Sequence, residues 1–175
     1  MRTDMRLTLA ALMLTGTMAL RAEEEKTVPV TPATDAEFVM KAASGGMFEV
    51  ESSKIAKTSA SSADVKKFAE MMIVDHEKAN KELMTAAKTA GLEVPTAISE
   101  PHQRVLNGLK SAKSTEFDTG FIKAQIAAHE EAVALFMGAS KSLKDPGLKA
   151  FATQTLPTLK EHLDAVRRLN TPNQK

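Results

Sequence analysis

Apolar residues recur every three or four positions through most of the chain after residue 34, which is the spacing that one face of an α-helix requires. Four long helices and one short helix are predicted in this way, with the approximate bounds 35–59, 62–90, 100–112, 114–143 and 146–170. No segment alternates apolar and polar residues over a useful length, so no sheet is expected. The predicted fold class is all-α.

The ends of these segments carry residues that favour helix starts and stops. Thr34 with Glu37 three residues later matches a capping box, and Asp145 followed by Pro146 is typical of a helix start. Gly91 is typical of a helix stop. Tight turns join the first long helix to the second and the third to the fourth, and a long link with its own short helix joins the two hairpins. This predicts a four-helix bundle with a short extra helix in the crossover.

The first residues have the layout of a secretory signal peptide: Arg2 and Arg6, an apolar run over Leu7–Leu20, and the small residue Ala22. As a helix the apolar run would be about 21 Å long, shorter than a hydrocarbon core of roughly 30 Å, which favours removal over anchoring. The expected location of the mature chain is periplasmic or secreted. The predicted organisation is a signal peptide at 1–22, a flexible leader at 23–34, the bundle domain at 35–170 and a tail at 171–175.

The composition excludes several classes of function. Lys and Arg number 23 against 22 Asp and Glu, so the chain lacks the basic excess of a nucleic-acid-binding protein. It has no Cys, which excludes disulfides and thiolate metal sites. It has no Tyr or Trp, which removes the usual relays for long-range electron transfer.

Three of the four histidines occupy core positions of three different long helices. His76, His129 and His162 each lie three or four residues from apolar core positions on both sides, so all three side chains are predicted to point into the bundle. At 1.5 Å per residue, each lies roughly 20–24 Å from one end of its helix, which places the three at similar heights. His102 falls in the crossover, where a solvated or capping role is expected.

The remaining long helix offers a carboxylate at a similar height. Glu49 shares a face with small and apolar residues, and Glu51 is the competing choice for the inward position. Imidazole nitrogens and a carboxylate oxygen are ligands that Zn, Cu or Fe accepts. We therefore predict one divalent transition-metal ion bound by His76, His129, His162 and either Glu49 or Glu51.

Neighbours one turn away can support such ligands through hydrogen bonds. The expected partners are Asn80 for His76, Gln125 for His129 and Thr158 for His162, with Asp75 and Glu161 as alternatives. Among the methionines, only Met72 is kept as a candidate Cu(I) ligand. A network of core histidines without metal is the alternative interpretation.

Several spaced elements resemble a bacterial family of exported, uncharacterised proteins. These elements are FVMKAASGGMFEVESSKIA, the pair Asp75 and His76, the pair Phe117 and Asp118, the lone His129, and LPTLKEHL. The family is labelled outer-membrane protein or domain of unknown function, and the resemblance implies a ferritin-like fold and an envelope location. Di-iron ferritin-like enzymes carry Glu-x-x-His on two helices, which this chain lacks, so a dinuclear iron site is not expected.

Three functions follow from these observations. The first is a periplasmic bundle that binds a single metal ion for buffering, sensing or stress protection. The second is a metal-free structural or interaction module of the envelope. A mononuclear metal enzyme ranks last, because the sequence shows neither an open coordination position nor a path for substrate. A metal ion is the expected partner, and envelope association and a homodimer are left open.

Overall fold

The computed structural model describes residue 32 and residues 34–171, with the side chains of Ser114 and Thr115 excepted. These residues form five helices and no strand, as the sequence predicts. The helices are α1 (Asp35–Ser59), α2 (Ala63–Thr89), α3 (Glu100–Ser111), α4 (Ser114–Ser142) and α5 (Pro146–Asn170). The predicted signal peptide, the predicted leader apart from residues 32 and 34, and residues 172–175 of the tail lie outside the described residues.

The predicted helix boundaries agree with the structure to within about two residues. The Thr34 hydroxyl accepts a hydrogen bond from the Glu37 amide at 3.0 Å, and the Asp145 carboxylate accepts one from the Leu148 amide at 2.9 Å. Gly91 follows α2 with a positive φ of 71°, a conformation that glycine adopts without steric cost. Local capping chemistry thus explains where the helices begin and end.

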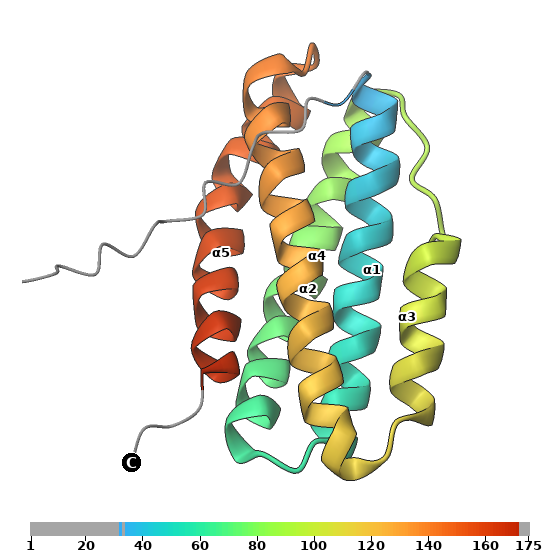
Figure 1. The fold of residues 1–175 in the computed structure, drawn as a ribbon. Coiled ribbons are helices and arrows are strands. Elements are labelled where there is room, and N and C mark those ends of the chain that lie inside the picture. Colours follow the sequence, from blue (N-terminus) through green and yellow to red (C-terminus); the bar gives the residue numbers. More distant parts are fainter. Residues whose placement is uncertain (1–31, 33, 172–175) are drawn as a thin grey trace, which may run out of the picture.

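The four long helices form a bundle in which α1 and α2 make one antiparallel hairpin and α4 and α5 make the other (Figure 1). Contacts between α2 and α5 and between α1 and α4 join the hairpins. The crossover after α2 runs along the outside of the bundle, and its helix α3 packs on α1 and α4. The interior therefore receives side chains from all four long helices.

Each hairpin begins with an aspartate that holds the turn of the other hairpin. The carboxylate of Asp35 in α1 accepts hydrogen bonds from the amides of Lys144 and Asp145, both at 2.9 Å. The carboxylate of Asp118 in α4 accepts hydrogen bonds from the amides of Ser61 and Ser62, at 2.9 and 2.8 Å. These contacts fix the register of the two hairpins along the bundle axis.

Two aromatic clusters fill the core on either side of its middle. Near the start of α1, the cluster consists of Phe38, Phe136 and Phe151. Near the start of α4, it consists of Phe68, Phe117 and Phe121. The central stretch of α4 between Phe121 and Phe136 carries His129, so the polar middle of the bundle lies between two apolar regions.

The Asp118→Ala variant is expected to lose about 1–3 kcal/mol of unfolding free energy, because two backbone amides in the α1–α2 turn lose a charged acceptor. Urea unfolding measures this change. Asp164→Ala on the exposed face of α5 is the matched control and should change stability by less than about 0.5 kcal/mol. Equal losses in the two variants would refute the role assigned to Asp118.

Candidate metal centre

Three imidazole rings meet in the middle of the bundle, as the sequence predicts. His76 comes from α2, His129 from α4 and His162 from α5, and all three are buried. Their ring centroids lie 5.4–5.7 Å apart. Core spacing on three helices and tight turns between helices are sufficient to produce this convergence.

The three rings present nitrogens at distances that suit a shared ion. One nitrogen from each ring can be chosen so that all three lie within 4.8 Å of one another. A point therefore exists within about 2.8 Å of all three, compared with metal–imidazole bonds of about 2.0–2.1 Å. Adjustments of less than about 1 Å would bring the trio to bonding distance, so the group can hold a metal ion.

Hydrogen bonds orient two of the rings and leave one nitrogen of each unpartnered. The Nδ1 atom of His129 lies 2.9 Å from the backbone oxygen of Gln125, and the Nε2 atom of His162 lies 3.0 Å from Oδ2 of Asp75. In these pairs the ring N–H donates and the oxygen accepts. The opposite nitrogens, Nε2 of His129 and Nδ1 of His162, are buried without a partner, as is Nε2 of His76.

Burial keeps two of these rings neutral. The pKa of His129 is lowered to about 4, mainly by burial; the backbone hydrogen bond to Gln125 acts in the opposite direction, and the nearby His162 adds to the lowering. Burial, followed by repulsion from His129 and His162, lowers the pKa of His76 well below the usual 6.5. Both rings therefore keep a nitrogen lone pair at neutral pH, which is the form that binds metals.

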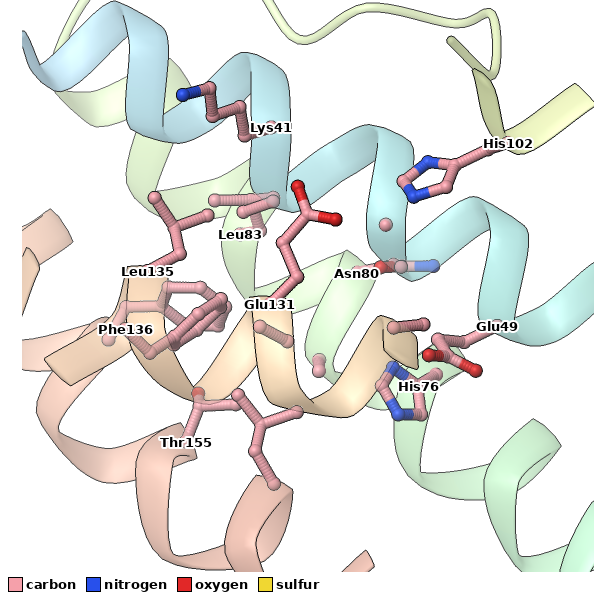
Figure 2. Close-up of a pocket in the computed structure, with 18 residues that line it drawn as sticks. Lys41, Glu49, His76, Asn80, Leu83, His102, Glu131, Leu135, Phe136 and Thr155 are labelled. Carbon is pink, nitrogen blue, oxygen red and sulfur yellow. The ribbon is translucent and has the colours of Figure 1, made fainter. Parts of the chain in front are cut away.

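Glu49 is the inward carboxyl group of α1, but it lies outside the trio of ligand atoms. Its side chain is buried, and Figure 2 shows it together with His76. Its Oε1 lies 3.4 Å from Nδ1 of His129, and its Oε2 has no hydrogen-bond partner. Burial raises its pKa to about 8, while the side chain of Gln125 acts in the opposite direction. With His129 also neutral, this contact is not a pair of full charges at pH 7.

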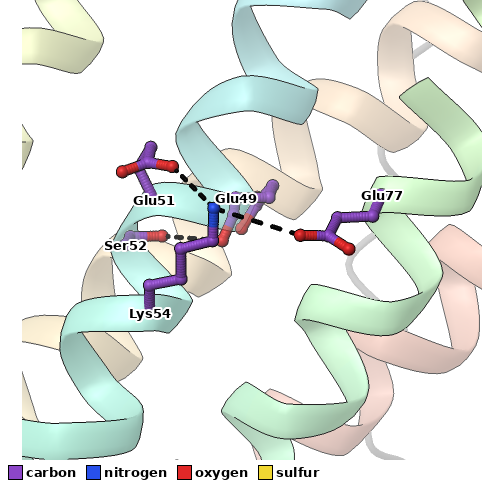
Figure 3. Close-up of polar contacts among 5 residues, drawn as sticks. All are labelled: Glu49, Glu51, Ser52, Lys54 and Glu77. Carbon is purple, nitrogen blue, oxygen red and sulfur yellow. Dashed lines mark hydrogen bonds and ion pairs between the residues drawn. The ribbon is translucent and has the colours of Figure 1, made fainter. Parts of the chain in front are cut away.

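The alternative that places Glu51 inward is wrong. Glu51 is exposed, and Lys54 pairs with it at 3.0 Å and with Glu77 of α2 at 3.9 Å (Figure 3). Two residues correspond to about 200° around a helix, so burying Glu49 turns Glu51 away from the core. The group of close ligand atoms in the core consists of the three histidines and does not include Glu51.

The supporting partners differ in part from the expected set. Gln125 serves His129 through its backbone oxygen, whereas Asp75, instead of Thr158, accepts from His162. Asp75 lies in α2 and His162 in α5. Their contact was not expected, because the expected partners of each histidine were neighbours on its own helix. Glu161 is exposed, and Met72 is fully buried in the apolar core.

A cavity of about 60 Å³ reaches this centre from the surface between α1 and α4. His76 and Glu49 line it at the buried end, and the exposed Glu131 and the half-buried His102 line it nearer the surface (Figure 2). The sequence revealed neither the cavity nor this place for His102, because both depend on how α3 docks on the bundle.

The sequence of residues 19–169 matches a family described as Domain of unknown function (DUF4142). The chain belongs to this DUF4142 family. The resemblance to a family of unknown function is thereby confirmed, while its exported character stays a prediction. Among curated proteins, none matches the sequence.

Two solved structures share the fold of this DUF4142 chain. CopM in the Cu(II)-bound form is 20% identical, with a TM-score of 0.66 over 78% of this chain and 95% of CopM. A DUF305 fragment from Deinococcus radiodurans is 16% identical, with a TM-score of 0.68 over 81% of this chain and 97% of the fragment. At these identities the likeness establishes the helical-bundle fold alone.

In the metal-free protein, Glu49→Gln should become more stable relative to wild type as the pH rises from 4.5 to about 8. Over this range the unfolded wild-type chain releases the Glu49 proton while the folded chain retains it, which penalises folding. The difference should reach roughly 5 kcal/mol and stay constant at higher pH.

Urea unfolding at a series of pH values, with chelator present, measures this difference. Glu51→Gln is the matched control, because it removes an exposed carboxyl group from the same helix. A stability difference between wild type and Glu49→Gln that does not vary with pH would contradict the buried, protonated state of Glu49.

Proposed function

We propose that this DUF4142 chain binds a single transition-metal ion through His76, His129 and His162. One observation carries the proposal: each ring has a buried nitrogen without a hydrogen-bond partner, and the three rings can offer nitrogens within 4.8 Å of one another. A buried, unsatisfied polar atom costs about 1–3 kcal/mol. A metal ion would satisfy three such atoms at once.

The nitrogen donors and the shared fold favour copper as the ion. Imidazole suits Zn, Cu and Fe, and a site of given nitrogen ligands generally binds Cu(II) most tightly among divalent first-row ions. CopM has the same bundle fold and is described in a Cu(II)-bound form. We therefore propose Cu(II) as the preferred ion, with Zn and Fe(II) as the ions against which it is compared.

The two other functions have less support. A metal-free network of histidines would leave the same three nitrogens unsatisfied. An enzyme acting on an organic substrate would need a pocket of about 300–1,000 Å³, and the cavity that reaches His76 is about 60 Å³. Storage or buffering of the ion needs only the site and a route to it.

We also propose that the chain acts in the periplasm, where it buffers the metal under stress. The signal-like layout of residues 1–22 supports this location. Among the described residues, no helix combines the length and the apolar character that crossing a bilayer requires.

Untagged protein should bind one Cu(II) per chain, and the variants His76→Gln, His129→Gln and His162→Gln should each weaken binding by at least about 100-fold, because each removes a ligand. Elemental analysis and chelator competition measure stoichiometry and affinity. His102→Gln, which removes a histidine outside the trio, should leave both unchanged. The absence of bound metal, together with melting temperatures that Cu, Zn and Fe do not shift, would refute the proposal.

Asp75→Asn should weaken Cu(II) binding by about 10–100-fold, because the Asp75 carboxylate orients the ring of His162 by accepting a hydrogen bond from the Nε2 atom of that ring. Glu77→Gln removes one exposed negative charge from the same helix and should change the affinity far less. Chelator competition on both variants provides the comparison. Equal losses would show that Asp75 acts only through its charge.

A further inference from the structure

The cavity between α1 and α4 connects the solvent to the buried site. Of the three histidines, only His76 lines the cavity, while His129 and His162 are closed off by the packed helices. An ion that reaches the trio through this cavity would pass Glu49 and meet His76 first. The described structure thus offers a defined direction of approach to the centre.

His102 is held firmly at the outer part of this cavity. Its Nδ1 lies 2.9 Å from the hydroxyl of Ser44, and that hydroxyl also accepts a hydrogen bond from the amide of Ser99 at 3.0 Å. The ring stacks on Phe48 with a centroid distance of 4.9 Å and an angle of 18°. These contacts fix the ring on the cavity wall, although none of them connects it to the three core histidines.

The charges around the outer end favour a cation. Burial lowers the pKa of His102, and the negative charge of Glu131, which also lines the cavity, acts in the opposite direction. Lys41 also lines the cavity, but Glu37 pairs with it at 2.7 Å. With His102 neutral, these groups leave a net negative charge at the entrance.

The size of the cavity requires an incoming ion to lose part of its water. One water needs about 10–15 Å³ by this measure of volume, so 60 Å³ holds about four to six waters. That space is too small for a divalent ion with a complete hydration shell. Ligands at the entrance that replace some of this water would lower the barrier to entry.

We propose that this cavity is the path by which the metal ion enters and leaves the site, and that His102 and Glu131 bind the ion transiently on the way. The proposal rests on the proposed function, since it concerns the ion bound by the three core histidines. The entrance groups act on the rates of loading and release. They do not touch the bound ion and leave the equilibrium affinity unchanged.

Gly45 allows the path to be blocked without disturbing the packing. It lines the cavity, and a Cβ atom added there would meet no side chain within 4 Å. Gly46, by contrast, faces Asn80 closely and is unsuitable for substitution. Gly45→Leu would place a bulky side chain in the cavity, and Gly45→Ala is the matched control because it changes helix propensity without filling the space.

Stopped-flow absorption with Cu(II) alone measures loading, and mixing the loaded protein with a chelator measures release. Gly45→Leu, His102→Gln and Glu131→Gln should each slow both rates by about tenfold, equivalent to roughly 1.4 kcal/mol in the barrier. The dissociation constant should stay unchanged, because a barrier on a path affects both directions equally. Gly45→Ala and Gln103→Ala, the latter beside His102 on α3, should match wild type.

Circular dichroism first establishes that each variant is folded. If Gly45→Leu is not folded, the rates of His102→Gln and Glu131→Gln decide the test. Wild-type rates in the folded variants would overturn the proposed path while leaving the three-histidine site intact. A weaker affinity with unchanged loading would overturn it as well, because the entrance groups would then be ligands of the bound ion. A wild-type chain that takes up no metal would refute the proposed function and this inference with it.

Discussion

Three buried imidazoles in the middle of the bundle each carry a nitrogen without a hydrogen-bond partner. Two aromatic clusters keep water from either end of this region, and burial holds His76 and His129 in their neutral forms. Such an arrangement costs folding free energy while it is empty, because polar atoms are buried without partners. A bound ion would recover that cost, so the proposed site would link metal affinity to folding stability.

The fold is organised so that this centre is held from several sides. Asp35 and Asp118 fix the two hairpins relative to each other, which sets the heights of the helices that carry the histidines. Gln125 and Asp75 then set the ring orientations through the nitrogens that face away from the trio. The cavity between α1 and α4 opens towards this centre, and α3 contributes His102 to its lining.

Much of this arrangement could be predicted from the sequence, since helix caps and core spacing are local properties. The convergence of His76, His129 and His162 follows from them and from the short turns. The sequence alone could not decide whether Glu49 or Glu51 points into the core. The reason is that α1 packs against α2, α3 and α4, so its buried residues do not define one inward face. The pairing of Asp75 with His162 and the position of His102 depend on contacts between helices that periodicity does not encode.

X-ray absorption spectroscopy of the Cu(II)-loaded, untagged protein identifies the ligands of the ion directly. We expect three imidazole nitrogens at about 2.0 Å from the metal and no sulfur neighbour. A spectrum with fewer than three imidazoles, or with methionine sulfur bound to the ion, would contradict this expectation.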